Sequence, residues 1–215
     1  QEDEQEFLQT ILQREHAPRL HALFEGVDIP LLQCRDCGLS RPVEDDIYFT
    51  CLPLSLLDAT RAPIASAQRA LDVFLTPEAL QDPDYHWTCA NSNCASTRLP
   101  LNQHHLTTKP RVLCLHLVRW RGGRDQDALL HTVRCEEDLD CEGTPYALRS
   151  VVCHMGETPR AGHYTCRVHY PNEGGNWWYY NNSERRLVRP GEVTTTAQVM
   201  GSVERSYLAF YERRD

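Results

Sequence analysis

The chain has 215 residues, and its content of 41% hydrophobic and 24% charged residues is ordinary for a folded globular protein of one large or two small domains. The formal net charge of −8 argues against nucleic acid as a partner, because phosphate binding requires clustered Lys and Arg, and it suits a basic partner. No apolar run approaches the length of a membrane span, so we expect no membrane partner.

The first half of the chain predicts an opening helix, a β unit and further helices. In residues 1–12 the apolar side chains recur on one helical face, and we expect that helix to end near Pro18. Thr76 and Pro77 are typical of a helix N-cap and a first helical residue, which predicts a new helix from Thr76. The other expected elements are strands over residues 27–32, 44–57 and 99–106 and a helix over 66–75.

Four of the ten cysteines lie in two short pairs. Cys34 and Cys37 form a C-x2-C pair, and Cys89 and Cys94 form a C-x4-C pair. Two such pairs supply two thiolates each to one tetrahedral zinc ion, whereas five disulfides would indicate a secreted protein. The spacing favours zinc, and reduced thiols point to the cytosol or nucleus. The other six cysteines are scattered singly, as small buried apolar residues would be: Cys51, Cys114, Cys135, Cys141, Cys153 and Cys166.

Strands dominate the second half of the chain. Residues 112–118 are apolar on both faces, which predicts a central buried strand. Residues 155–160 contain Gly156 and Pro159 and predict a loop. Further strands are expected over residues 131–139, 146–155, 164–170, 177–180 and 206–211. Several strands in series with little helix between them predict an α+β fold with a mostly antiparallel sheet.

A hairpin near the end of the chain places a histidine beside an asparagine. Gly174-Gly175 separates two runs rich in aromatic and β-branched residues, so His163 at the entry of one strand and Asn181 at the exit of the next are expected to meet at one sheet edge. In thiol proteases an imidazole takes the proton of a cysteine, and an Asn carbonyl fixes its tautomer. The alternatives are a structural histidine and, for Asn181-Asn-Ser, a turn or an N-glycosylation acceptor.

Five motifs in chain order resemble the ubiquitin-specific protease family of cysteine deubiquitinases, and together they span essentially the whole chain. Each motif is weak alone, but their order is specific. They are residues 1–8, similar to the family's Gln-Gln-Asp-x-x-Glu-Phe helix; the two cysteine pairs, where the family has zinc-bound fingers; the strand 110–119; Gly162-His163-Tyr164 with Trp177 and Asn181; and the closing strand 207–211.

The resemblance implies a papain-like cysteine peptidase fold of fingers, palm and thumb. It implies a remnant of the helical thumb in residues 1–25, zinc-ribbon-like fingers in 26–108 and a palm sheet in 109–215 that holds the His/Asn half of the active site. Cys34, Cys37, Cys89 and Cys94 would then bind one structural zinc ion.

For the active site, the resemblance implies that His163 is the general base and then acid, and that Asn181 orients it. Asn182 follows where the family usually has Asp, and we include it among the candidate catalytic residues. Residues 155–161 would form a flap over the channel for ubiquitin's basic tail, near acidic Asp3 or Glu4. The family's nucleophile lies upstream of the opening helix and no cysteine here matches its motif, so residues 1–215 alone are expected to be inactive.

The expected function is hydrolysis of the isopeptide bond at the C-terminal glycine of ubiquitin, with ubiquitin and ubiquitinated proteins as partners. A first alternative is an inactive ubiquitin-binding scaffold of the same fold. A second is a secreted, disulfide-rich module glycosylated at Asn181. One zinc ion with free thiols would favour the deubiquitinase or the scaffold of the same fold. Five disulfides without metal would favour the secreted module.

Overall fold

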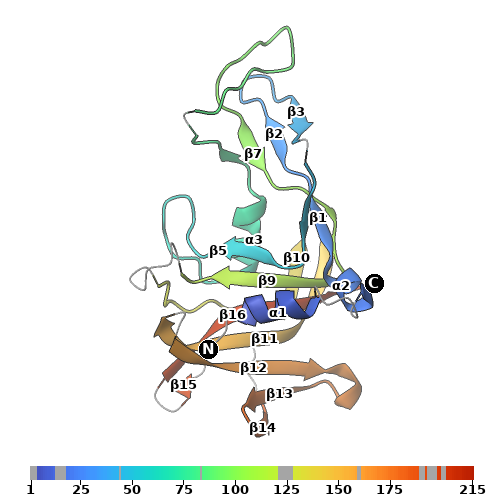
Figure 1. The fold of residues 1–215 in the computed structure, drawn as a ribbon, viewed down its shortest axis with the longest axis vertical. Coiled ribbons are helices and arrows are strands. Elements are labelled where there is room, and N and C mark those ends of the chain that lie inside the picture. Colours follow the sequence, from blue (N-terminus) through green and yellow to red (C-terminus); the bar gives the residue numbers. More distant parts are fainter. Residues whose placement is uncertain are drawn as a thin grey trace. The chain divides into compact units, whose positions relative to one another are not determined.

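The computed structural model describes residues 4–12, 18–43, 45–82, 84–120, 128–158, 161–188, 192, 198–199 and 202–215. These residues form two compact units (Figure 1). Unit 1 consists of Gln1–Phe24, Thr50–Leu71 and Pro110–Asp215, and unit 2 of Glu25–Phe49 and Asp72–Lys109. Residues 50–71 therefore belong to unit 1, although they lie within the predicted fingers range of 26–108.

Unit 1 is built on a nine-stranded sheet with the order β14-β13-β12-β11-β16-β9-β5, to which β10 and β15 add at β11 and β16. Among the described strands of this sheet, only β5 and β9 pair in parallel. The predicted α+β class with a mostly antiparallel sheet is confirmed. The strands are β5 (Leu52–Ser55), β9 (Val112–Val118), β10 (Asp138–Cys141), β11 (Thr144–Thr158), β12 (Ala161–Tyr170), β13 (Asn176–Asn181), β14 (Glu184–Leu187), β15 (Gln198–Val199) and β16 (Ser202–Arg213).

The central strand predicted within residues 109–120 is confirmed as β9, which covers the run that is apolar on both faces, Val112–Val118. It lies between β16 and β5, and its Leu113, Leu115 and Leu117 are fully buried. Burial of one such side chain is worth about 1.5–3 kcal/mol relative to exposure, so this strand contributes strongly to the core.

The first two helices of the chain pack against this sheet. The opening helix α1 is described over Glu4–Leu12, and residues 13–17, which reach its predicted end near Pro18, lie outside the described part of the chain. Pro18 begins α2 (Pro18–Phe24), because its fixed φ suits a first helical position. Phe24 meets Phe210 of β16 edge-on, and Leu8 joins the same apolar cluster. None of the described helices is long and apolar enough to cross a membrane.

Unit 2 consists of two small sheets with the orders β4-β1-β8 and β3-β2-β7-β6. The predicted strand over residues 27–32 is divided between them, because Pro30 has no N–H for a ladder and its carbonyl accepts from Val43. Leu32, Trp87 and two cysteines form the small core. The strands are β1 (Gly26–Asp28), β2 (Leu31–Gln33), β3 (Ser40–Pro42), β4 (Ile47–Phe49), β6 (Glu78–Ala79), β7 (Leu101–Gln103) and β8 (Leu106–Thr108).

The helix predicted from Thr76 is wrong. The preceding helix α3 (Ala67–Leu75) is confirmed, and Thr76 closes it, since its hydroxyl donates to the Asp72 carbonyl at 2.6 Å. Glu78–Ala79 then pair with β7 as strand β6. The sequence fits Thr76 either as the end of this helix or as the N-cap of a new one. The pairing of β6 with β7 excludes the new helix.

The loop predicted over residues 155–160 is also wrong over residues 155–158. Strand β11 continues to Thr158, and Met155 pairs with both His163 of β12 and Glu204 of β16. The partner strand β12 overrides Gly156, because its ladder continues past it to the pair of Thr158 with Ala161 after a register shift, whereas the pairing with β16 ends at Met155. Residues 159–160 lie outside the described part of the chain. The predicted strand over 131–139 begins only at Asp138.

Candidate active site and metal centre

The hairpin of β12 and β13 positions the candidate active-site residues. A short 3-10 turn (Pro171–Glu173) leads to Gly174 and Gly175, whose φ angles of +75° and +70° lie in the left-handed region that favours glycine. Arg167 pairs with Tyr179 across the two strands. Because side chains alternate along a strand, odd-numbered residues of both strands share one face.

His163 and Asn181 meet on that face, 18 positions apart in the chain. The His163 Nε2 and Asn181 Oδ1 atoms are 2.6 Å apart, and both side chains are partly exposed. An amide oxygen only accepts, so Nε2 carries the hydrogen of the neutral ring and Nδ1 carries the lone pair. This is the tautomer in which Nδ1 can take a proton from a thiol.

Asn182 lies at the turn between β13 and β14. Asn181 pairs with Glu184, so Asn182 and Ser183 form a two-residue turn, and Asn182 adopts a φ of +50° that Asn tolerates. Its side chain is exposed. Within the described residues, no hydrogen bond joins Asn182 to the His163 ring. Its catalytic role stays a prediction.

A buried polar group that the sequence did not reveal lies on the same face. Glu204 of β16 is 0% exposed; its Oε1 accepts from the hydroxyls of Thr165 at 2.7 Å and Tyr179 at 2.8 Å, and its Oε2 pairs with Arg167. The one available signal was Arg167, a charged residue within the strand predicted over 164–170.

Gly162 allows β12 to pass close to β11. A Cβ added at Gly162 would lie 2.1 Å from Nε2 of His154 and 2.7 Å from the carbonyl oxygen of Met155. The His154 ring is buried between Trp120 and Tyr164, with ring centroids 5.1 and 4.8 Å away. The glycine of the Gly-His-Tyr motif is therefore required by packing.

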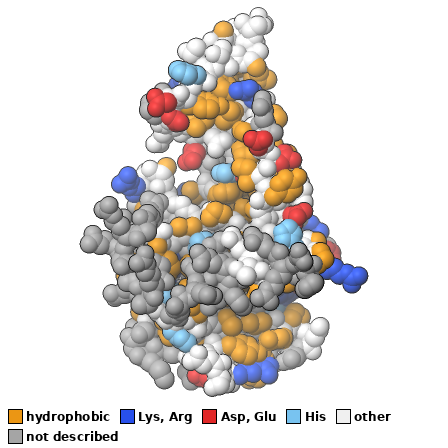
Figure 2. Space-filling view, viewed as in Figure 1, with side chains coloured by type: hydrophobic (Ala, Val, Ile, Leu, Met, Phe, Trp, Pro, Cys, Tyr) orange, Lys and Arg blue, Asp and Glu red, His pale blue; other side chains and the backbone are white. Residues whose placement is uncertain are grey.

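The other face of the hairpin is chemically different. The guanidinium carbon of Arg185 lies 3.8 Å from the centroid of the Trp178 ring and also faces Tyr170 and Tyr180. Figure 2 shows hydrophobic side chains gathered over this part of unit 1, with Lys or Arg side chains beside them. These contacts are structural and separate from His163.

Neither cysteine of the hairpin region is suited to be the nucleophile. Cys153 shares the face of His163, but it is buried, its Sγ accepts from Arg167 at 3.0 Å, and burial raises the pKa of its thiol to about 11. Cys166 is three positions from His163 on β12 and therefore lies on the opposite face. The suggested acidic partners Asp3 and Glu4 fall outside the described side chains.

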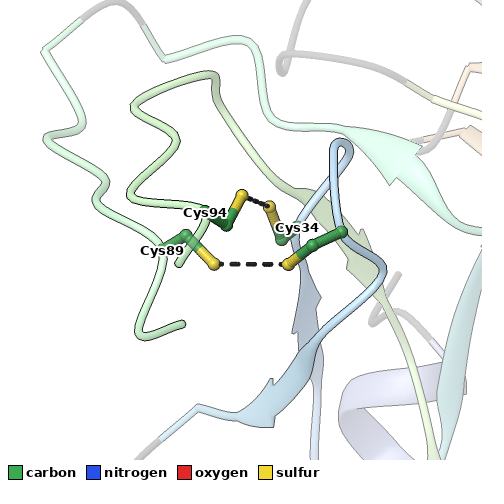
Figure 3. A group of neighbouring side chains, drawn as sticks. Cys34, Cys89 and Cys94 are labelled. Carbon is green, nitrogen blue, oxygen red and sulfur yellow. Dashed lines mark hydrogen bonds between the residues drawn. The ribbon is translucent and has the colours of Figure 1, made fainter. Parts of the chain in front are cut away.

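The four paired cysteines come together in unit 2 (Figure 3). The Sγ atoms of Cys34 and Cys94 are 3.9 Å apart, those of Cys37 and Cys89 are 3.6 Å apart, and all four lie within 4.8 Å of one another. A tetrahedral site with Zn–S bonds of about 2.3 Å places its sulfurs about 3.8 Å apart. The cluster therefore has the dimensions of a metal site.

The electrostatics of the cluster also fit a cation. The backbone N–H groups of Cys37 and Asp36 lower the pKa of Cys34 to about 7. The Asn91 N–H lowers the pKa of Cys89, but burial and the neighbouring thiols outweigh it and raise the value to about 12. Several thiolates at this spacing repel one another, so a bound cation is needed for all four to ionise. All ten cysteines are free thiols, which does not support the five-disulfide alternative.

Comparison with known proteins identifies the family of this chain. The sequence model described as ubiquitin carboxyl-terminal hydrolase matches residues 1–211, so the chain belongs to this family. The human Ubl carboxyl-terminal hydrolase 18 is 26% identical over 195 residues, which cover 83% of this chain and 50% of that protein. Ubiquitin carboxyl-terminal hydrolase 8 of Arabidopsis thaliana is 27% identical over 192 residues, which cover 80% of this chain and 20% of that protein.

Solved structures show the same fold. The SAGA DUB module Ubp8/Sgf11/Sus1/Sgf73 bound to monoubiquitin matches with a TM-score of 0.79 at 25% identity, over 100% of this chain and 49% of that one. The same module bound to ubiquitin aldehyde matches with a TM-score of 0.80 at 24% identity. This chain therefore spans half or less of the proteins to which it is compared here.

Proposed function

We propose that this chain is part of a cysteine-type deubiquitinase, which hydrolyses the isopeptide bond between the C-terminal glycine of ubiquitin and a lysine. The observation that supports the proposal is the 2.6 Å contact between His163 and Asn181, in the tautomer that thiol catalysis requires, in a chain of the ubiquitin carboxyl-terminal hydrolase family. The ubiquitin-bound state of the SAGA DUB module supports ubiquitin as the partner.

In this mechanism Nδ1 of His163 takes the proton of a cysteine thiol, and the thiolate attacks the scissile carbonyl carbon. The imidazolium then gives that proton to the leaving lysine amine, and a thioester with the ubiquitin glycine remains. Water, deprotonated by His163, hydrolyses the thioester and restores the thiol. Asn181 holds Nε2–H throughout, and Asn182 would contribute a neutral amide at the same edge.

The thiol in this proposal comes from outside residues 1–215, because Cys153 is buried against Arg167 and Cys166 lies on the far face of β12. Residues 1–215 alone are therefore expected not to cleave. The proposed roles of the parts follow the family: thumb in 1–25, ubiquitin-gripping fingers in 26–108, and palm in 109–215. Residues 155–161 would adjoin the channel for the ubiquitin tail.

The cysteine cluster is proposed to bind one structural zinc ion through Cys34, Cys37, Cys89 and Cys94. Their sulfur spacing and the need for charge compensation support this assignment. Bound there, the ion would cross-link two turns of unit 2, and no step of hydrolysis passes through it. Reduced thiols favour a cytoplasmic or nuclear protein.

The test uses the full-length protein that contains this chain and ubiquitin with a fluorogenic C-terminal amide. We expect cleavage, which His163→Ala abolishes because no base then accepts the thiol proton. His169→Ala is the matched control, because His169 lies on the same strand but hydrogen-bonds Arg149 and Gly175. It should retain activity.

A second candidate is an inactive ubiquitin-binding scaffold, which the uncharged Asn182 favours. Ubiquitin binding by the full-length protein without any cleavage would establish the scaffold and overturn the enzyme. Asn181→Ala and Asn182→Ala measure the two amides separately, and a larger loss is expected for Asn181, since it alone contacts the ring in the described structure.

A further inference from the structure

The stability of the fold does not by itself explain the buried ion pair of Glu204 with Arg167. The side chains of Glu204 and Arg167 are 0% and 3% exposed, and they form an ion pair. Removing two charges from water costs several kcal/mol per ion, so apolar residues of similar size often serve stability as well or better. Such a pair is explained more readily by the geometry that it imposes on its neighbours.

The hydrogen bonds around Glu204 have a fixed direction. A carboxylate only accepts, so the Tyr179 hydroxyl donates its single hydrogen to Oε1, at 2.8 Å. Burial, together with the contact to Glu204, raises the pKa of Tyr179 to about 12, so the phenol keeps that hydrogen near neutral pH. The Tyr179 oxygen is then left only as an acceptor.

Asn181 lies two residues further along β13, on the same face as Tyr179. Beside it, the Tyr179 oxygen can only accept, which matches the Asn181 NH2 group, and Asn181 lowers the pKa of Tyr179, as a donor to that oxygen does. The Asn181 NH2 group therefore faces Tyr179, and its Oδ1 faces Nε2 of His163 at 2.6 Å. The carboxylate of Glu204 thus fixes which atoms donate and which accept at Tyr179 and Asn181, and through them at the imidazole of His163.

We infer that Tyr179 and Glu204 are positioning residues that set the orientation of the Asn181 amide and, through it, the tautomer of His163. The catalytic consequence rests on the proposed function. Without the Tyr179 hydroxyl, the NH2 group loses that acceptor, and the contact with His163 alone fits either orientation of the amide, because Nε2 can donate or accept. A rotated amide presents its NH2 group to Nε2, which must then accept, so the ring hydrogen moves to Nδ1 and the lone pair that takes the thiol proton is lost.

The primary variant is Tyr179→Phe in the full-length protein, which removes one oxygen and keeps the ring. Tyr146→Phe is the matched control: Tyr146 is equally buried in the sheet, and its hydroxyl donates to the Pro110 carbonyl at 2.7 Å. The first readout is the 15N NMR spectrum of the His163 ring, which reports the tautomer and needs no activity. The second is kcat and KM for the fluorogenic ubiquitin amide.

In the wild type and in Tyr146→Phe we expect the Nε2–H tautomer. In Tyr179→Phe we expect a large population of the Nδ1–H tautomer. We also expect kcat to fall about tenfold or more while KM changes less than about twofold, as for other residues that orient a side chain in contact with the reacting groups. The double variant Glu204→Gln with Arg167→Met removes both charges and should shift the tautomer in the same direction.

Either of two results overturns the inference: an unchanged tautomer in Tyr179→Phe, or an equal loss of kcat in Tyr146→Phe. The proposed function fails separately. If the wild type binds ubiquitin without cleaving it but the tautomer shifts in Tyr179→Phe, the positioning inference holds and the enzyme proposal does not. If the wild type cleaves and Tyr179→Phe changes neither readout, only the positioning inference fails.

Discussion

At the scale of single residues, the Gly-His-Tyr motif combines two independent requirements. His163 is placed by its contact with Asn181, whereas Gly162 is placed by the close approach of His154 on the neighbouring strand. The first requirement concerns proton transfer, and the second concerns packing. They can therefore be separated by measuring stability apart from activity.

We expect Gly162→Ala to lower the free energy of unfolding by about 1–3 kcal/mol, because the new methyl group meets the His154 ring and a backbone oxygen in a packed sheet. Urea unfolding of the full-length protein measures this loss. In a His154→Ala background the same substitution should cost less, since the nearest atoms are gone. An equal cost in both backgrounds would show that the two residues do not interact.

At the scale of elements, a row of charged side chains joins three neighbouring strands. Glu212 of β16 accepts from Arg149 of β11 at 2.8 Å and from Arg111, just before β9, at 3.0 Å. The hydrogen bond from Arg149 contributes most to lowering the pKa of Glu212, and burial opposes it. Since each side chain is about one third exposed, water screens much of the attraction.

This row predicts a pH dependence of stability. Because the folded state lowers the pKa of Glu212 below its ordinary 4.5, the group stabilises the fold above pH 4.5, and the benefit is lost as pH falls through the lowered value. We expect Glu212→Gln to cost at most about 1 kcal/mol at pH 7 and progressively less below pH 4.5.

Urea unfolding from pH 7 to pH 3 measures this difference. Glu184→Gln on the edge strand β14 is the control for replacing one carboxylate by an amide, because Glu184 is exposed. A cost for Glu212→Gln that is the same at pH 3 as at pH 7 would contradict the assignment.

At the scale of the whole molecule, the two units differ in the size of the core that stabilises them. Unit 1 has a nine-stranded sheet with helices packed on it, whereas unit 2 has strands of two or three residues and a core of a few side chains, including Cys34 and Cys89. A core of that size usually needs a metal ion or disulfides. Since its cysteines are free thiols, unit 2 is expected to depend on a metal.

We expect the purified protein to contain one zinc ion per chain. Removing it with a chelator should increase hydrogen exchange in β2 and β7 and leave β9, β11 and β16 protected, because the cysteine cluster lies within unit 2. Elemental analysis and exchange mass spectrometry measure both effects. Cys34→Ser should lose the metal and Cys114→Ala should keep it; metal-free protein with protected β2 and β7 would refute the assignment.

Features that depend on neighbouring residues could be predicted from the sequence alone. The apolar run over residues 112–118 predicted β9, and the β-branched and aromatic content of 164–170 predicted most of β12. The spacing of two cysteine pairs predicted that four thiols would meet. These patterns are local, since a strand run or a C-x2-C turn depends on a few adjacent side chains.

Only the tertiary structure decided which distant residues become partners. Thr76 fitted either end of a helix until β6 paired with β7, and nothing near Glu204 in the sequence indicates that it lies beneath Tyr179 and Arg167. Those contacts follow from the register between strands far apart in the chain, and a shift of one residue would turn every side chain to the other face. The sequence by itself therefore determined the His/Asn hairpin and the cysteine cluster, whereas the long-range strand register alone decided what holds the amide beside the imidazole.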